Sequence, residues 1–328
     1  MTGITRRRAL ALTASALASP IVARSVDAQE DFPAREIKVV CAYPPGSGAD
    51  TLARYYAEGM KPFLSKPVIV ENRAGANGNL AAGYLARSKP DGYTVMVDAA
   101  SFVINQSLYP KLAYDAEKAF APVGVLAAFP HVIVVTPGYE AKSAADLIAR
   151  AKASPGAISY ASSGTGSAQH LAGAAFIQQT KAEMTHVPYK GGGPAMNDVM
   201  GGHIPVFFAN IASGLSHIKG GKLRALAVAG QSRVAALPDV PAIGELGLSG
   251  SAVYEWNGMF VPAGTPDAVI GKLADALNKA LQAPEVKQRI ADLGGELIGG
   301  GRDGAGKFIA DQRAITARLI RDGNIKPD

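Results

Sequence analysis

Short apolar runs alternate along the chain with stretches in which apolar residues recur at helical spacing. In the first half, this pattern predicts strands near residues 37–43, 67–71 and 93–97 and helices near 48–62 and 77–87. In the second half, it predicts strands at 121–127, 132–135, 157–160, 184–187, 205–208 and 223–228, and helices from Ser143 and near 167–179, 192–201 and 211–218. This alternation indicates an α/β fold in which helices cover mainly parallel sheets.

The last third of the chain has a different pattern. Residues 231–252 are rich in Pro and Gly and indicate a connecting segment, after which Val253–Val261 is predicted as a strand. Thr265 and Pro266 are typical of a helix start, with Thr265 as the N-cap of a helix that runs to about Gln282. Pro284 begins another helix, and a last helix covers about 304–321. We expect this helical tail to pack back on the first half.

The first 28 residues are typical of an export signal. Arg6-Arg7-Arg8 precedes an Ala/Leu/Thr-rich run to about Ala23, and Val26-Asp27-Ala28 is a suitable cleavage site. The arginines partly match the twin-arginine consensus, and the general secretory route stays open. No later segment has 18 uninterrupted apolar residues. We therefore expect cleavage near Ala28 and a soluble mature protein in the periplasm.

Composition and charge fit an ordinary globular protein of one or two domains and do not indicate a nucleic-acid-binding one. The chain has 328 residues, of which 48% are hydrophobic and 18% charged, and its formal charge is +6. Residues 1–28 contribute four Arg and one Asp, which leaves +3 for the mature chain, and the basic residues do not cluster. Cys41 is the only cysteine, so the chain forms no intramolecular disulfide.

One arrangement occurs twice: an apolar strand, a Gly/Ser-rich loop and a helix. The first copy is Ile37–Asp50, with the loop Pro-Pro-Gly-Ser-Gly, and the second is Ile158–Gln169, with the loop Ser-Ser-Gly-Thr-Gly-Ser. The first N–H groups of a helix lack intrahelical acceptors and carry partial positive charge, so each loop predicts an anion-binding site. Two such sites, one in each half, indicate a small anionic ligand held between two lobes.

For several side chains near these loops, the sequence allows both a ligand-binding role and a structural role. The negative charge of Asp50 would repel an anionic ligand. We therefore expect Asp50 to cap the first helix by accepting hydrogen bonds from backbone N–H groups. His170, on the first turn of the second helix, either donates to a carboxylate or serves as a cap. His131 either contacts ligand or is structural. We expect Tyr189 to line a cleft, and Lys190 either steers an anion or is solvated.

Other chemistries find less support. Neither Gly46-Ser-Gly48 nor Gly164-Thr-Gly166 continues to the third glycine of a dinucleotide-binding loop. The sequence lacks the phosphate-binding Gly-x4-Gly-Lys-Ser/Thr motif and the Gly-x-Ser-x-Gly nucleophile elbow. The five histidines form no His-Glu-x-x-His motif, and no cysteine pair exists to complete a zinc site. We therefore expect neither a metal nor a cofactor.

Eight segments match one family in order along the mature chain. They are Tyr43–Asp50, Val70–Gly78, Lys89–Thr94, Ser162–Ser167, His186–Gly191, Leu223–Val228, Leu237–Pro241 and Pro262–Pro266. The sequence resembles the Bug family, the TctC-like extracytoplasmic solute receptors of tripartite tricarboxylate transporters. The resemblance implies a two-lobed periplasmic binding protein fold of type II character, with a mixed, mainly parallel sheet flanked by helices in each lobe and two hinge crossovers.

The resemblance also implies a domain division and a function. Residues 29–128 and 250–328 would form lobe 1, and residues 129–249 would form lobe 2. The cleft closes on a small organic carboxylate, and the monomeric, non-enzymatic receptor then docks on the membrane components of a transporter, with no nucleic-acid partner. Relatives hold the carboxylate largely through backbone groups and waters of the two loops. The ligand-binding residues predicted here are Tyr43, Pro45, Gly46, Ser47, Gly48, Asp50, Ser101, Ser162, Ser163, Gly164, Thr165, Gly166, Ser167, His170, Tyr189 and Asn210.

The sequence departs from the family pattern at three positions. Pro205 and Ala209 stand where relatives usually carry Asp, and Ala119 stands where they tend to carry Asp. Fewer acidic groups near the lobe 2 loop before Ser213 either widen the ligand range or reflect local repacking. The solute therefore stays open among dicarboxylates, tricarboxylates, amino acids and aromatic acids.

Two other functions stay open. One is an exported enzyme that acts on a small carboxylate, with Ser163 or Ser167 as nucleophile and His170 as base, although no third orienting group accompanies them. The other is a ligand-sensing subunit that reports occupancy to a sensor.

Overall fold

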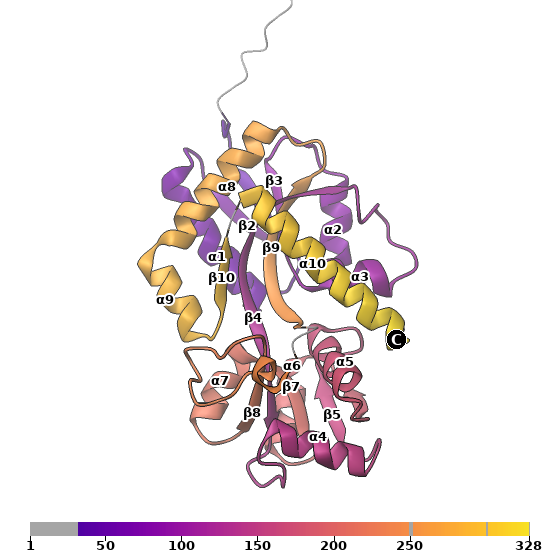
Figure 1. Cartoon of the computed structure of the whole chain (residues 1–328). Coiled ribbons are helices and arrows are strands. Elements are labelled where there is room, and N and C mark those ends of the chain that lie inside the picture. Colours follow the sequence, from indigo (N-terminus) through magenta and orange to yellow (C-terminus); the bar gives the residue numbers. More distant parts are fainter. Residues whose placement is uncertain (1–31, 249–251, 300, 328) are drawn as a thin grey trace, which may run out of the picture. The chain divides into compact units, whose positions relative to one another are not determined.

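Strands and helices alternate from β1 onward in the computed structural model of the chain, which describes residues 32–248, 252–299 and 301–327 (Figure 1). The first part contains β1 (Ile37–Cys41), α1 (Gly48–Met60), η1 (Lys61–Phe63), β2 (Val68–Asn72), η2 (Ala76–Gly78), α2 (Asn79–Ala86), β3 (Thr94–Ala99), α3 (Ser101–Leu108) and β4 (Phe120–Val135). The middle part contains α4 (Ala144–Ala153), β5 (Ser159–Ser162), α5 (Ala168–Thr180), β6 (Thr185–Pro188), α6 (Gly192–Met200), β7 (Val206–Asn210), α7 (Ile211–Lys219), β8 (Arg224–Ala229) and η3 (Ile243–Leu246). The last part contains β9 (Tyr254–Pro262), α8 (Asp267–Gln282), α9 (Pro284–Asp292), β10 (Glu296–Gly299) and α10 (Gly301–Asp322).

Strand β4 is shared by two groups of strands. In the first group, β2, β1 and β3 run parallel, and β9 pairs antiparallel with both β3 and β4. β10 also pairs antiparallel with β4. In the second group, β6, β5 and β7 run parallel, while β7 and β8 pair antiparallel with His131–Val135 of β4. The expected α/β fold with mixed strands flanked by helices is confirmed, but the strands of the described residues are not mainly parallel, because five of their nine pairings are antiparallel.

The pairing directions make the two Gly/Ser loops approach each other. β4 runs from the first group into the second (Figure 1), and β1 and β3 point the same way because β9 is antiparallel to both β3 and β4. β5 and β7 point the opposite way, because β7 is antiparallel to β4. The carboxyl ends of the parallel strands in both groups therefore face each other, which is where open α/β sheets bind ligands.

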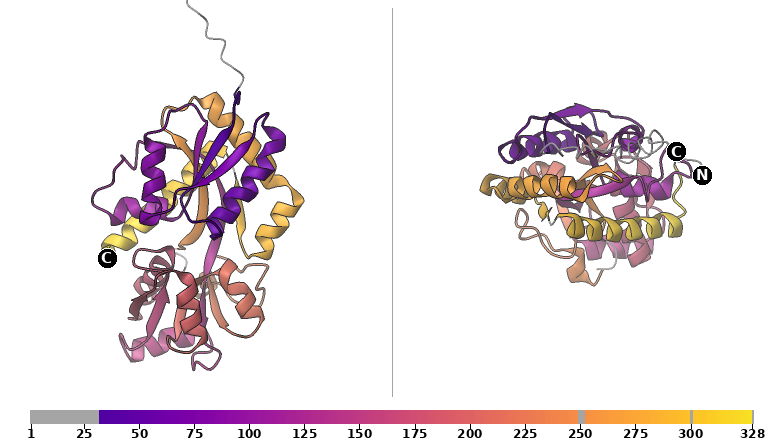
Figure 2. Two further views of the ribbon diagram at one scale, coloured as in Figure 1. Left: turned by 180° about the vertical axis from the view of Figure 1, so that it is seen from behind. Right: turned by 90° about the horizontal axis from the view of Figure 1, so that it is seen from above.

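The C-terminal helix packs on both groups of strands. Helix α10 lies against β4, α3 and α8, with α8 beside it in Figure 2, and the ring of Phe308 meets that of Trp256 edge-on at 5.6 Å between centroids. Its far end contacts α5, where Gln178 Nε2 donates to the carbonyl oxygen of Leu319 at 3.3 Å. The tail thus packs on the first half as expected and also on the second.

Some expectations about the elements are wrong. The strands predicted at 121–127 and 132–135 are one continuous strand, β4. Pro130 is the last residue of β4 in register with β9, and pairing with β7 and β8 begins at His131. Helix α3 is buried on nearly all sides and β10 has four residues, so neither has a clear amphipathic pattern. Thr265 is not the N-cap of α8; Pro266 is, and the Thr265 hydroxyl donates to Pro262 O at 2.7 Å.

Among the described residues, no helix is long and apolar enough to cross a membrane. The predicted export signal lies outside the described residues.

Candidate ligand-binding site

The loop between β1 and α1 is held by its own side chains. Ser47 is the N-cap of α1, and its Oγ accepts from the N–H of Asp50 at 3.2 Å. The Asp50 carboxylate accepts from Gly46 N–H at 2.9 Å, and Arg54 Nε and Asn72 Nδ2 also donate to it. Burial opposes ionisation, but these hydrogen bonds lower the pKa of Asp50 to about 2. Asp50 therefore stiffens the loop as expected, whereas the cap of α1 that was expected of Asp50 is provided by Ser47.

The loop between β5 and α5 repeats this geometry. Ser167 is the N-cap of α5, and its Oγ accepts from the N–H of His170 at 3.2 Å. Its φ and ψ are −70° and 160°, against −70° and 161° for Ser47. His170 in the second loop corresponds to Asp50 in the first, because His170 Nδ1 accepts from Gly166 N–H at 3.0 Å. Of the two roles open for His170, the structure gives the capping contact.

Each capped helix leaves two N–H groups without an intrahelical acceptor. They belong to Gly48 and Ala49 in α1 and to Ala168 and Gln169 in α5. These groups lie at the facing carboxyl ends of the parallel strands and carry the positive end of each helix dipole. Sequence reasoning missed Ala49, Ala168 and Gln169, whose side chains carry no chemical signal. The available signal was their position in the sequence, because each lies within two residues after a serine that caps a helix.

The hydroxyl groups of the second loop are partly committed to local contacts. Ser162 Oγ hydrogen-bonds His186 Nε2 at 2.6 Å, and Ser163 Oγ donates to Gln169 Oε1 at 2.5 Å. The His186 ring stacks on that of His170, with 3.7 Å between centroids and 6° between planes. Ser162, the serine paired with an imidazole ring, has no exposed surface, so it is poorly placed to act as a nucleophile.

Tyr189, directly after β6, and Asn210, the last residue of β7, lie at the same edge as Ser162. The Tyr189 hydroxyl donates to Asp198 Oδ2 at 2.7 Å, and Tyr189 N–H donates to Ser162 O at 3.1 Å. Asn210 is the N-cap of α7, and its Oδ1 accepts from Ala212 N–H at 2.8 Å. The structure therefore brings Tyr189 and Asn210 to the strand ends that carry the second loop.

Two acidic residues that sequence reasoning missed lie beside Ser101. Ser101 Oγ donates to Asp98 Oδ1 at 3.1 Å, and the Tyr43 hydroxyl lies 2.6 Å from Ser101 Oγ. Burial raises the pKa of Asp98 to about 7 and that of Glu255 to about 7, and the Glu255 carboxyl accepts from the N–H of Ala100. An acid at the end of the apolar strand β3 was the available signal for Asp98.

The second loop contacts the first group of strands through α3. Gly166 has φ +72°, and a Cβ atom placed on it would lie 2.3 Å from Leu108 Cδ2. Only glycine therefore fits between this loop and α3 without displacement of Leu108.

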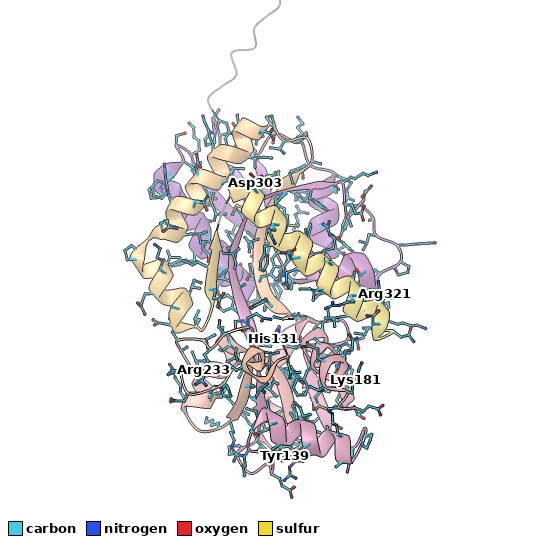
Figure 3. The ribbon with its side chains drawn as sticks, viewed as in Figure 1. His131, Tyr139, Lys181, Arg233, Asp303 and Arg321 are labelled. Carbon is cyan, nitrogen blue, oxygen red and sulfur yellow. The ribbon has the colours of Figure 1, made fainter. Side chains whose placement is uncertain are left out.

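His131 lies on β4 where the two groups of strands meet (Figure 3). Its ring is fully buried, and its Nδ1 lies 3.0 Å from the carbonyl oxygen of Val253. Burial lowers the pKa of His131 to about 4. These contacts favour the structural role over contact with a ligand.

Two surface hollows lie away from the predicted residues. One, of about 390 Å³, lies between α1, η1, α8 and α9, and the other, of about 360 Å³, lies beside α2. Neither is lined by a predicted ligand-binding residue. Within the described ranges, no group of three or more His, Cys, Asp or Glu side chains is arranged to hold a metal ion.

Residues 52–325 match the family model described as "Tripartite tricarboxylate transporter family receptor", abbreviated TctC. The chain belongs to the TctC receptor family. It is 34% identical over 321 residues to protein BugT of Bordetella pertussis, a match that covers 97% of this chain and 98% of BugT. This confirms the resemblance to the Bug family that the eight sequence segments indicated.

Two solved structures are similar to this TctC-family chain. Rpa4515 of R. palustris with adipate is 29% identical, has a TM-score of 0.80 and matches 91% of this chain and 100% of its own. MatC of Rhodopseudomonas palustris with bound malate is 29% identical, has a TM-score of 0.75 and matches 88% of this chain and 100% of its own. The fold is therefore that of the TctC solute-binding proteins.

Proposed function

We propose that this chain is a periplasmic receptor that captures a small carboxylate-bearing solute and delivers it to the membrane components of a tripartite tricarboxylate transporter. Membership of the TctC family supports this role, and the adipate and malate bound to similar R. palustris proteins support the carboxylate class. The protein acts as a monomer and does not transform its solute. Export by the signal in residues 1–28 belongs to the same proposal.

The observation that carries the proposal is the repeated loop geometry. Ser47 and Ser167 cap α1 and α5 with the same backbone angles, and each cap leaves two N–H groups on the first turn. Strand directions point both loops toward each other from opposite sheets. One carboxylate-bearing solute that accepts hydrogen bonds from both helix N-termini satisfies this arrangement.

We propose that residues 29–128 and 250–328 form lobe 1, that residues 129–249 form lobe 2, and that the lobes close on the solute about a hinge in β4. Two features support the hinge. Pro130 lies where β4 changes partners, and the loop beside Gly166 meets α3. Solute held by both loops stabilises the closed arrangement, because it contributes contacts that exist only when the lobes are together.

A melting-temperature screen tests the proposed function. The mature protein is heated with mono-, di-, tri- and aromatic carboxylates and, as matched controls, with the corresponding uncharged carboxamides. A solute that binds only the folded protein stabilises it by about 2.7 kcal/mol at 100 times its Kd, so at least one carboxylate is expected to raise the melting temperature by several degrees.

The carboxamides are expected to leave the melting temperature unchanged. If no carboxylate raises it, or if carboxamides raise it equally, the carboxylate proposal is wrong. Recovery of the bound solute unchanged after prolonged incubation with the protein supports a receptor, whereas its conversion supports the enzyme alternative.

A further inference from the structure

Two histidines hold the backbone of the loop between β5 and α5. His170 Nδ1 accepts from Gly166 N–H at 3.0 Å. The His186 ring stacks on the His170 ring, with 3.7 Å between centroids and 6° between planes, and so restricts its orientation. His186 Nε2 hydrogen-bonds Ser162 Oγ at 2.6 Å, and Ser162 Oγ also accepts from Gly164 N–H at 3.1 Å. The histidine pair therefore reaches both glycines of the loop.

These contacts decide where the first N–H groups of α5 point. Gly164 and Gly166 have φ of +134° and +72°, and glycine has more backbone alternatives than any other residue. Hydrogen bonds that hold their N–H groups remove those alternatives. Gly166 directly precedes Ser167, the N-cap of α5, so a shift of Gly166 moves the start of the helix on which the solute carboxylate is proposed to bind.

The His170 ring carries no charge in this arrangement. A ring nitrogen that accepts a hydrogen bond has no hydrogen of its own, so the ring hydrogen of His170 is on Nε2 and the imidazole is neutral. His170 is the third residue of α5, and the third residue of α1 is Asp50, whose carboxylate accepts from Gly46 N–H at 2.9 Å. The two loops thus hold equivalent glycines with acceptors of different charge.

The charge of Asp50 is balanced by a basic residue one turn further along α1. Arg54 Nη2 lies 3.0 Å from Asp50 Oδ1, and Arg54 Nε donates to Asp50 Oδ2 at 3.1 Å. Helix α5 has Ala174 at the corresponding position, and its sequence contains no Asp, Glu, Lys or Arg. A carboxylate at position 170 would therefore have no cation on its own helix and would repel an anion bound at the start of that helix.

We propose that His170 is a positioning residue that fits the second loop to an anion. Its Nδ1 holds Gly166, and with it the N–H groups of Ala168 and Gln169, without placing a negative charge beside the solute. This inference rests on the proposed function and deepens it, because it names the residue that lets this loop accept a carboxylate.

Three substitutions of His170 separate the shape of the loop from its charge. His170→Asn keeps a neutral acceptor, because an Asn Oδ1 takes the position of the imidazole Nδ1. His170→Asp keeps the acceptor and adds a negative charge, and His170→Leu removes the acceptor. Isothermal titration of malate and of adipate at neutral pH measures affinity, and the melting temperature of each free variant reports its folding.

The three variants are expected to differ in a fixed order. His170→Leu loses at least about tenfold in affinity, because Gly166 N–H is left without its acceptor, and His170→Asn restores most of this loss. His170→Asp melts no lower than His170→Asn, since a carboxylate in the first turn of a helix is stabilising. It nevertheless binds each acid at least about tenfold more weakly than His170→Asn does.

Salt dependence and a second histidine provide the controls. An increase from about 0.05 M to about 0.5 M NaCl is expected to narrow the difference between His170→Asp and His170→Asn, because salt screens the repulsion. His203→Asp introduces the same charge at an exposed position in the turn after α6 and is expected to leave both affinities unchanged.

Equal affinities of folded His170→Asn and His170→Asp proteins overturn the inference and leave the proposed function standing. So does a folded His170→Leu protein that binds as tightly as wild type. If the variants do not fold, or if neither probe binds, 15N NMR of the free wild-type protein decides: the ring hydrogen of His170 is expected on Nε2, and a hydrogen on Nδ1 overturns the inference. A wild-type protein that binds no carboxylate in the melting screen overturns the proposed function itself.

Discussion

Replacement of Gly166 with valine is expected to weaken solute binding by at least about 100-fold, which corresponds to about 2.7 kcal/mol. A Cβ atom at this position would lie 2.3 Å from Leu108 Cδ2, so the loop or α3 must move. The φ of +72° adds strain for a β-branched residue. Displacement of the loop moves the N–H groups of Ala168 and Gln169 away from the solute. Isothermal titration with the best carboxylate of the melting screen measures the loss.

Gly221→Val is the matched control for this experiment. Gly221 has φ +68° in the turn after α7, and nothing lies within 4 Å of an added Cβ. This control carries the same backbone strain without the contact with α3, so its affinity is expected to equal that of wild type. Equal affinity of Gly166→Val and wild type, with both variants folded, would show that the second loop does not hold the solute.

Asp98→Asn is expected to make the protein more stable than wild type at high pH. Burial raises the pKa of Asp98 from its ordinary 3.8 to about 7. A carboxyl with a raised folded-state pKa stabilises the fold fully below the unfolded pKa, and that contribution is lost as the pH rises through the folded pKa. The unfolding free energy of Asp98→Asn minus that of wild type should therefore increase by about 4 kcal/mol between pH 4 and pH 8. Urea titrations at pH 4, 6 and 8 measure this difference.

Asp50→Asn is the control of opposite sign. The hydrogen bonds to Asp50 lower its pKa to about 2, so its stabilising contribution is present above the unfolded pKa and is lost as the pH falls through 2. Relative to wild type, Asp50→Asn should lose about 2 kcal/mol as the pH rises from 2 to 5. If the difference in unfolding free energy between Asp98→Asn and wild type does not change between pH 4 and pH 8, the pKa of Asp98 is not raised by burial in the folded protein.

Hydrophobic periodicity was sufficient for most of the fold. The runs that became β1 and β7 are short and mostly apolar, and the amphipathic helices α1, α4 and α8 have apolar and polar faces. Periodicity failed where packing removes the contrast between faces, as in α3, whose residues are buried on nearly all sides. It also failed at Pro130, where a residue that usually ends a strand lies inside one because the strand changes partners there.

The two backbone loops of the candidate site could be predicted from the sequence, whereas most of its side-chain contacts could not. Gly and Ser residues before a helix mark the two loops, because few other residues provide positive φ and a cap in so short a segment. The contact of Glu255 with Ala100 was not visible, because these residues are 155 positions apart in the chain and meet only once β9 lies beside β3 and β4. That Asp50 and His170 accept from the N–H groups of equivalent loop glycines also emerges only from three-dimensional geometry.

A crystal structure of the protein with the carboxylate that most raises its melting temperature tests the central claim most directly. The account predicts one solute whose carboxylate lies within hydrogen-bonding distance of the N–H groups of Ala168 and Gln169, directly or through one water. It also predicts that the same solute contacts the loop Pro45–Asp50 from the opposite side. A solute that contacts neither loop, or that occupies the hollow between α1 and α8, would contradict the account.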